Sequence, residues 1–346
     1  MRKKLTVLLS ALILLLLSAC GSNSSSGSND QNGQNEQKSE KIEGTLQFYT
    51  SQPDADAEKL VAGFKEKYPD VKVETFRSGT EEVISKVKAE KMSGKVQADV
   101  MLLADSVTFE SLKKEDLLQA YESKEAGSIP EEFIDADHMY FGTKVMATAL
   151  AVNTDKVKSL PKGWEALTSA DAKDKVIMPS PLYSGAAAYN LGVFTRQNDF
   201  GWDFYESIKG NNAVVTKGNG DVLKAVASGE KSYGMVVDFI VARAKAEGSP
   251  VDLVYPEEGV PVITEPIGIM KDAKNAAAAK AFVDYVLSED GQELAVELGY
   301  TPIREGISAP EGLQTIDKMK VLKTDINELY QSREDDKKKF GDLFGK

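Results

Sequence analysis

The stretch "TLQFYTSQPDADAEKLVAGFKEKYPDVKVETF", residues 45–76, decides the fold. Its first seven residues predict a β-strand, and residues 71–76 predict a second one. Between them, residues 55–70 predict a helix that ends at Pro69, because apolar side chains three and four residues apart share one helical face. That face holds Leu60, Val61, Phe64 and Tyr68. The order strand, helix, strand is typical of a βαβ unit.

The same alternation continues along the chain. Residues 78–94 predict a second helix, residues 98–104 a continuously apolar strand, and residues 105–118 a third helix. Continuous apolar strands are buried on both faces, as in a parallel sheet covered by helices. The first part of the chain is therefore predicted to form a buried, mainly parallel α/β sheet.

A second α/β region follows "ATALAVNTD", residues 147–155. Its predicted strands are residues 175–180 and 232–238, and its predicted helices run from Ser184 to about Arg196, over 218–230 and over 239–248. Residues 263–270 predict a strand that leaves this region, and residues 274–299 predict one long helix or two helices joined at Gly291. No repeat of fixed period appears, which excludes a solenoid.

The chain begins with a basic, then apolar, then small-residue segment. "MRKKLTVLLSALILLLLSAC" is short for a membrane span and has the layout of a secretory signal. Its end, Leu-Ser-Ala-Cys, resembles the bacterial lipobox, which implies cleavage after residue 19 and lipidation of Cys20. Residues 20–43 are almost all small or polar and predict a flexible tether. We therefore expect a domain anchored by lipid on the extracytoplasmic face of the cell membrane.

Composition narrows the class of protein. The formal net charge is −12 and no basic stripe is present, which argues against a nucleic-acid partner. Cys20 is the only cysteine, so no internal disulfide can form. The sequence has no Walker A run, no Gly-x-Ser-x-Gly elbow and one histidine, so we expect no enzyme and no cofactor. An enzyme or an adhesive surface lipoprotein stays an alternative class.

Several segments follow one another in a characteristic order: "YTSQPDADAEKLVAGFKEKYPDVKVE", "ADVMLLADSVTFESLKKEDLL", "AVNTDKV", "LPKGWEALT", "YSGAA", "VLKAVASGE", "YGMVVD" and "AKAFVDYVLSEDGQELAVELGYTPI". Together they resemble the solute-binding proteins of ABC importers, in the group with ferric-iron, sugar-phosphate, aminoethylphosphonate and thiamine-phosphate receptors. The resemblance spans roughly residues 44–310. It implies a type 2 periplasmic-binding architecture: two Rossmann-like α/β lobes joined by two crossing strands, with a ligand in the cleft.

The resemblance also implies the lobes and the partners. The first lobe is expected to comprise residues 44–148 and 267–308, and the second lobe residues 149–266 and 309–346. We expect a monomer that binds a small anionic ligand and docks on an ABC permease in the membrane.

The positions of ferric ligands in this family carry other residue types here. By the resemblance, the family's His, Glu and Tyr pair correspond to Pro53, Ala104 and the pair Phe239 and Ile240. Ferric iron requires hard, anionic oxygen ligands, which these side chains lack. The single histidine, His138, matches no ligand position, so we expect no metal site.

The family's anion site, in contrast, has matching residues. A helix N-terminus exposes unpaired N–H groups and a partial positive charge, so it can receive phosphate. The candidate ligand-binding residues are Ser51, Ser78, Gly79, Thr80, Asp105, Ser184, Gly185, Ala186, Asn219 and Asp238.

Some of these candidates have an alternative role. Ser78 with Glu81 fits a capping box, and Ser184, Asp105 and Asp238 fit ordinary N-caps. As a ligand contact, Asp238 could receive an amine or a sugar hydroxyl.

The sequence therefore predicts a receptor for a small phosphorylated or phosphonate ligand, such as aminoethylphosphonate, a sugar phosphate or a thiamine phosphate. An anion-assisted ferric receptor is the alternative.

Overall fold

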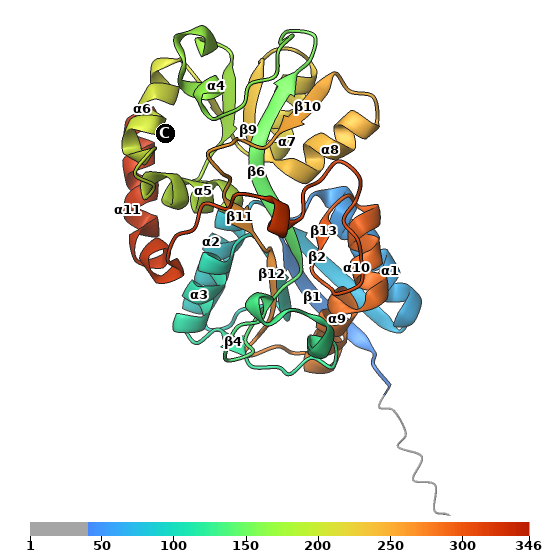
Figure 1. The fold of residues 1–346 in the computed structure, drawn as a ribbon. Helices are drawn as coiled ribbons and strands as arrows, with labels where there is room; N and C mark the ends of the chain where they lie inside the picture. Colours follow the sequence, from blue (N-terminus) through green and yellow to red (C-terminus); the bar gives the residue numbers. More distant parts are fainter. Residues whose placement is uncertain (1–40, 346) are drawn as a thin grey trace, which may run out of the picture. The chain divides into compact units, whose positions relative to one another are not determined.

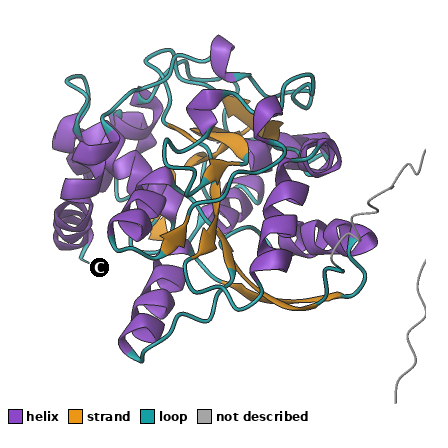
Figure 2. Cartoon of the chain, turned by 90° about the horizontal axis from the view of Figure 1, so that it is seen from below, coloured by secondary structure: helices purple, strands orange, loops and turns teal. Residues whose placement is uncertain are grey.

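The computed structural model describes residues 41–345. The predicted signal peptide, Cys20 and the tether up to residue 40 lie outside the described residues. Within them, the strands gather into two sheets, each covered by helices (Figure 1). Figure 2 shows the helices lying around the strands, as expected for buried sheets.

The first sheet has the strand order β2, β1, β3, β12, β4, with β5 paired to β12. As predicted, β1 is parallel to β2 and to β3, while β12 returns from far along the chain and is antiparallel to β3. The strands are β1 (Gly44–Thr50), β2 (Val71–Arg77), β3 (Val100–Leu102), β4 (Leu118–Gln119), β5 (Phe141–Gly142) and β12 (Pro266–Met270). Their helices are α1 (Asp54–Lys67), α2 (Thr80–Met92), α3 (Ser106–Lys114), α9 (Ala276–Leu287) and α10 (Glu289–Glu297).

The second sheet has the order β10, β6, β9, β7, β8, and β11 and β13 also pair with β6. Its strands are β6 (Lys144–Asn153), β7 (Val176–Pro179), β8 (Val214–Thr216), β9 (Tyr233–Val237), β10 (Val251–Val254), β11 (Val262–Ile263) and β13 (Thr301–Pro302). Its helices are α4 (Glu165–Thr168), α5 (Gly185–Thr195), α6 (Gly201–Gly210), α7 (Asn219–Ala227), α8 (Asp238–Ala246) and α11 (Ile326–Phe344). Short 3₁₀ turns lie at Ala126–Ser128, Glu131–Phe133, Ala170–Ala172 and Ile316–Lys318.

We call each sheet with its helices a lobe. The chain crosses between the lobes where β5 gives way to β6, and crosses back where β11 gives way to β12. The predicted fold, two α/β lobes joined by two crossing strands, is confirmed. The exact residue boundaries of the lobes stay a prediction.

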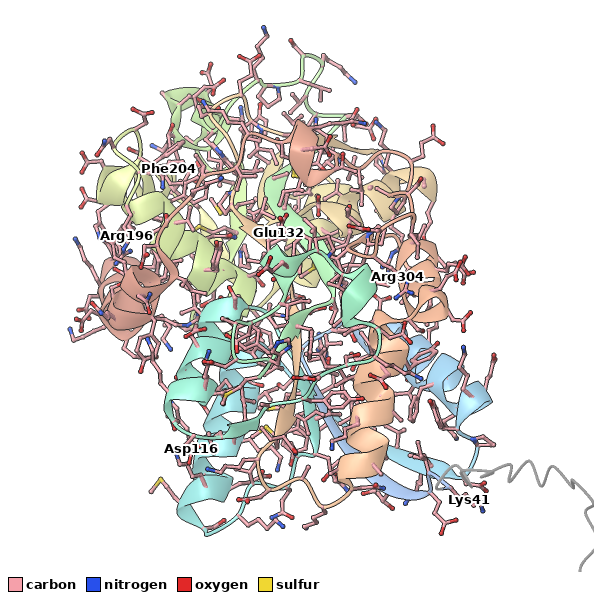
Figure 3. The ribbon with its side chains drawn as sticks, turned by 60° about the horizontal axis from the view of Figure 1, so that its bottom comes forward. Lys41, Asp116, Glu132, Arg196, Phe204 and Arg304 are labelled. Carbon is pink, nitrogen blue, oxygen red and sulfur yellow. The ribbon has the colours of Figure 1, made fainter. Side chains whose placement is uncertain are left out.

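Each lobe has its own aromatic core. In the first lobe, the ring centroids of Phe64 and Phe48 lie 4.9 Å and 4.8 Å from that of Phe282. In the second lobe, Phe194 lies 5.0 Å from Trp164 and 4.9 Å from Phe204. Figure 3 shows Phe204 inside the second lobe and Arg196 beside α11. Each lobe thus packs its own aromatic rings, while the buried apolar cluster continues from one lobe into the other.

Three local predictions need correction. Residues 263–270 form two strands rather than one, because Glu265 between β11 and β12 has a backbone φ of 23° that interrupts the extended chain. Residues 274–299 form two helices, but the break is at Ser288 instead of Gly291, since the Ser288 side chain caps the start of α10. The capping box of Ser78 and Glu81 is wrong: Gly79 is the N-cap of α2, and Ser78 donates its hydroxyl to Glu82.

None of the helices between residues 41 and 345 combines the length and the apolar character that crossing a membrane requires.

Candidate functional site

A cavity of about 520 Å³ lies between the lobes. The first lobe contributes Ser51, Pro53, Arg77, Gly79, Thr80 and Ala104 to its wall. The second lobe contributes residues 183–186, 217–221, 237, 239, 240, 243, 244 and 247, among others. Because both lobes form the wall, a ligand held there would contact both of them.

Three helices begin at this cavity. Thr80, Gly185 and Asn219 are the first residues of α2, α5 and α7, and all three line the wall. The first N–H groups of a helix have no partner within the helix, and the helix dipole places a partial positive charge there. The structure therefore directs three positive helix ends, one from the first lobe and two from the second, at one cavity.

Side-chain hydroxyls and an amide accompany these helix ends. Ser184 caps α5, and its Oγ accepts from the N–H of Ala187 at 3.3 Å and from Nδ2 of Asn219 at 3.4 Å. Oδ1 of Asn219 accepts from the N–H of Val237 at 3.2 Å, which fixes the orientation of the amide. We call Ser51, Thr80, Ser184, Gly185, Ala186 and Asn219 the helix-start cluster.

Two cations that the sequence analysis did not single out line the same wall. Arg77 is the last residue of β2 and donates from Nε to the carbonyl of Gln52 at 2.6 Å. Lys217 precedes α7, and its Nζ lies 5.2 Å from the centre of the Tyr183 ring. Their only sequence signal is position, because each directly precedes a loop that leads into a helix of the cluster. They add positive charge to the helix ends.

The other end of the cavity is aromatic. The rings of Phe239 and Tyr300 lie 4.1 Å apart, and the guanidinium of Arg243 lies 5.3 Å from the Phe239 ring. Arg243 makes two hydrogen bonds to Asp56, at 3.0 and 3.1 Å, and the Tyr300 hydroxyl donates to the same carboxylate at 2.7 Å. We call Phe239, Arg243 and Tyr300 the aromatic end.

Glu265 is a buried acidic group in the cavity wall. Its carboxylate pairs with Lys144, whose Nζ also lies 4.7 Å from the centre of the Tyr300 ring. Burial raises the pKa of Glu265, and the nearby Lys144 only partly opposes that effect. The aromatic end therefore also offers a carboxyl group.

Of the ten predicted ligand residues, seven line the cavity: Ser51, Gly79, Thr80, Ser184, Gly185, Ala186 and Asn219. They come from four separate places in the chain, and the fold brings them together. Their contact with a ligand stays a prediction.

The other three lie outside the cavity wall and have protein partners. Ser78 donates to Glu82. Asp105 caps α3 and binds Arg333, and Asp238 accepts from the N–H groups of Ala147 and Phe239 and from the Tyr255 hydroxyl. The N-cap alternative is confirmed for Asp105 but wrong for Asp238, because Val237 is the N-cap of α8 and Asp238 is its first residue. Contact of these three residues with a ligand stays a prediction.

The positions matched to ferric ligands also reach the cavity: Pro53, Ala104, Phe239 and Ile240 all line it. Their side chains offer no oxygen donor to a metal ion. Within residues 41–345, no group of three or more histidine, cysteine, aspartate or glutamate side chains is arranged to hold a metal ion.

Known proteins show the same sequence pattern and the same fold. Residues 48–301 match the family model of the bacterial extracellular solute-binding proteins. An uncharacterised protein of Haemophilus influenzae is 30% identical over 75% of this chain and 78% of its own length. A probable ABC transporter periplasmic-binding protein of Sinorhizobium fredii, y4fP, is 27% identical over 67% of each chain.

Solved structures of binding proteins have the same fold as this chain. The periplasmic binding protein AfuA of Actinobacillus pleuropneumoniae, solved with fructose-6-phosphate bound, has a TM-score of 0.80 at 25% identity, covering 87% of this chain and 98% of its own. Iron-bound HitA of Pseudomonas aeruginosa has a TM-score of 0.76 at 21% identity, covering 86% and 99%, which shows the fold alone. With its two lobes, interlobe cavity and family match, this chain belongs to the bacterial extracellular solute-binding proteins and serves as the solute-binding protein of an ABC importer.

Proposed function

We propose that the chain captures a small phosphorylated or phosphonate ligand in the interlobe cavity. The observation that carries the proposal is the convergence of the starts of α2, α5 and α7 on one cavity. Phosphate is bound well by such helix ends, because they offer N–H donors and positive potential together. Arg77 and Lys217 add formal charges of the same sign.

The magnitudes explain why several groups are needed. One helix end contributes about 0.3–1 kcal/mol when exposed and up to about 2 kcal/mol when partly buried. A micromolar receptor needs about 8 kcal/mol in total. Three helix ends, hydroxyls and two cations are therefore a reasonable set for an anion, and a single helix end is not.

The aromatic end suggests the rest of the ligand. Phe239 and Tyr300 provide a flat apolar surface, and Glu265 provides a carboxyl group that can accept from an amine or a hydroxyl. Aminoethylphosphonate, a sugar phosphate and a thiamine phosphate each combine an anionic head with such a tail. That AfuA was solved with fructose-6-phosphate supports this ligand class.

The signal-like N-terminus and the family support a location outside the cell membrane. We propose that Cys20 is lipidated and that the chain acts as a monomer tethered outside the membrane, where it delivers the ligand to a permease without chemical change.

Calorimetry on the purified chain tests the proposal with 2-aminoethylphosphonate, hexose phosphates, thiamine phosphate, inorganic phosphate and ferric salts. We expect one-to-one binding of at least one phosphorylated or phosphonate compound. Stoichiometric binding of ferric iron with tyrosinate-to-iron colour, and of nothing else in the set, would contradict it. Release of phosphate from a bound compound would instead indicate an enzyme.

A further inference from the structure

The C-terminal helix α11 is fixed to the second lobe on one face. Leu329 packs so closely against Gly192 of α5 that a Cβ at that glycine would lie 2.6 Å from it. Phe340 lies 6.0 Å from the Tyr205 ring of α6. Arg196, the C-cap of α5, pairs with Asp336 at 2.8 Å. These contacts would move α11 together with the second lobe.

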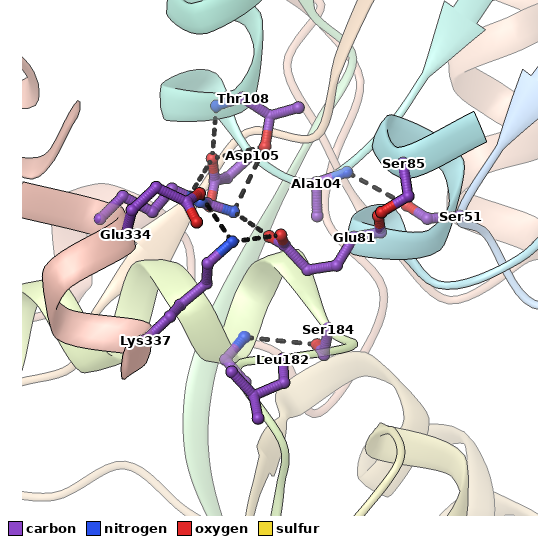
Figure 4. A network of polar contacts seen from close by, with 12 residues as sticks. Ser51, Glu81, Ser85, Ala104, Asp105, Thr108, Leu182, Ser184, Glu334 and Lys337 are labelled. Carbon is purple, nitrogen blue, oxygen red and sulfur yellow. Dashed lines mark hydrogen bonds and ion pairs between the residues drawn. The ribbon is translucent and has the colours of Figure 1, made fainter. Parts of the chain in front are cut away.

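Cations on an adjoining part of the same side of α11, one turn from Leu329 and Phe340, bind the first lobe. Arg333 donates from Nη1 to both carboxylate oxygens of Asp105, at 3.1 and 2.9 Å, and from Nη2 to Glu81 at 2.9 Å. Lys337 donates to Glu81 at 2.7 Å (Figure 4). The Asp105 side chain is fully buried and that of Arg333 is 11% exposed, so water screens these pairs poorly.

The two carboxylates lie beside the cavity wall of the first lobe. Glu81 follows Thr80 in the first turn of α2, and Asp105 follows Ala104. Thr80 and Ala104 both line the cavity and face Gly185 of the second lobe. Arg333 therefore holds the two wall segments that meet the start of α5.

We propose that Arg333 is a positioning residue, and that through it α11 acts as an interlobe clasp which favours the closed cavity before any ligand enters. Opening the cavity moves the first lobe away from the second and must separate Arg333 from Asp105 and Glu81. The clasp shifts the equilibrium between open and closed forms toward the closed form, so less of the ligand's binding energy is needed for closure.

The test measures backbone amide hydrogen exchange on the full chain in detergent with no ligand added. Its outcome therefore does not depend on the proposed function. The informative segments are residues 54–62, in the first part of α1, and residues 238–247, which span α8; both helices lie on the side of the molecule away from α11 (Figure 1). In Arg333→Gln we expect at least threefold faster exchange in both segments, because the whole cavity opens more often.

Arg196→Gln is the matched control, because it removes pairs between α11 and its own lobe and leaves the clasp intact. It should leave both segments unchanged. Arg333→Lys, which keeps the charge without the planar fork, should fall between wild type and Arg333→Gln. Wild-type exchange in Arg333→Gln, or an equal rise in Arg196→Gln, would overturn the clasp.

If circular dichroism shows that Arg333→Gln does not fold, Glu81→Gln decides instead. It removes the carboxylate shared by Arg333 and Lys337 and leaves Asp105 to satisfy Arg333. We expect at least twofold faster exchange in the same two segments, and unchanged exchange would overturn the proposal.

Discussion

At the scale of single residues, Gly185 of the second lobe lies in very close contact with the first lobe. A Cβ added there would lie 2.1 Å from the Ala104 carbonyl oxygen and 2.7 Å from Oγ1 of Thr80, both in the first lobe. A side chain at position 185 therefore does not fit between the lobes as they lie in this structure. The small residues of "YSGAA" thus allow the helix end to approach the opposite lobe.

We predict that Gly185→Ala weakens binding of the best phosphorylated or phosphonate probe at least tenfold, because the methyl group blocks closure. The free energy of unfolding should change by no more than about 1 kcal/mol, since alanine is favoured over glycine within helices. Titration calorimetry and urea unfolding measure the two effects.

Gly220→Ala is the control for the Gly185 variant. Gly220 lies in the first turn of α7 and lines the same cavity, but an added Cβ there would meet no atom within 4 Å. Its affinity should stay within about twofold of wild type. Equal affinities for wild type and Gly185→Ala would show that the ligand binds elsewhere.

Asp238 gives a prediction on pH. Burial raises the pKa of this carboxyl from its ordinary value of 3.8 to about 7, despite the hydrogen bonds that it accepts. Because the folded state binds the proton more tightly than the unfolded chain, the stabilisation from protonated Asp238 is complete below pH 3.8 and is lost as pH rises toward 7.

Asp238→Asn keeps the shape without the charge. From about pH 4 to 7, its unfolding free energy should rise relative to wild type, by up to about 1.4 kcal/mol per pH unit. Urea unfolding at several pH values measures this difference. Asp155→Asn, on the exposed turn after β6, controls for the loss of a carboxylate in general. A difference that stays constant with pH would contradict the prediction.

At the scale of elements, the sequence predicts well what depends on local periodicity. The βαβ order of residues 45–76 and the helix that starts after Ser184 are confirmed. Local periodicity does not predict the backbone conformation of a single residue, and it does not predict every helix. Backbone conformation at one residue, such as the φ of 23° at Glu265, leaves no hydrophobic pattern. The sequence analysis places residues 326–344 in the second lobe without predicting a helix there, and in the structure they form α11.

The candidate site also contains both residues that the sequence predicts and residues that it does not. Seven of the predicted residues reach the cavity because they follow strands or start helices, and such positions meet at the edge of an α/β sheet. Arg243 and Glu265 were missed because their places depend on how the lobes meet, and no local pattern encodes that contact. Asp105 has the position of a ligand residue, but α11 covers it.

A substitution at the start of α7 tests whether the helix-start cluster binds an anion. Asn219→Asp keeps the Oδ1 that accepts from Val237, removes the donor to Ser184 and places a negative charge in the cluster. We expect calorimetry to show at least a hundredfold weaker binding of an anionic probe, because like charges repel strongly where water is scarce. Asn219→Ala, without the added charge, should weaken binding only about tenfold, near the 1.4 kcal/mol of one or two hydrogen bonds. If Asn219→Asp and Asn219→Ala bind the anionic probe with equal affinity, the helix-start cluster does not contact the anion.

At the scale of the whole molecule, the two crossings meet in a buried ion pair. Lys144 begins β6 and Glu265 separates β11 from β12, and their side chains are 4% and 5% exposed. Thr143 ties the crossings together as well, because its hydroxyl donates to the Glu265 carbonyl at 2.7 Å. The lobes are thus joined at a place where charge is fully enclosed.

We predict that Lys144→Met lowers the unfolding free energy by about 3–5 kcal/mol at pH 8, because it leaves the Glu265 carboxylate buried without a partner. Since burial raises the pKa of Glu265, protonation should relieve part of this loss at pH 5. Lys144→Met combined with Glu265→Leu should recover most of the stability, because an apolar pair of similar volume needs no compensation for lost hydration. Urea unfolding of the three chains at both pH values measures these differences. If the double variant is no more stable than Lys144→Met alone, the crossing requires the charged pair itself, and hydrophobic packing cannot replace it.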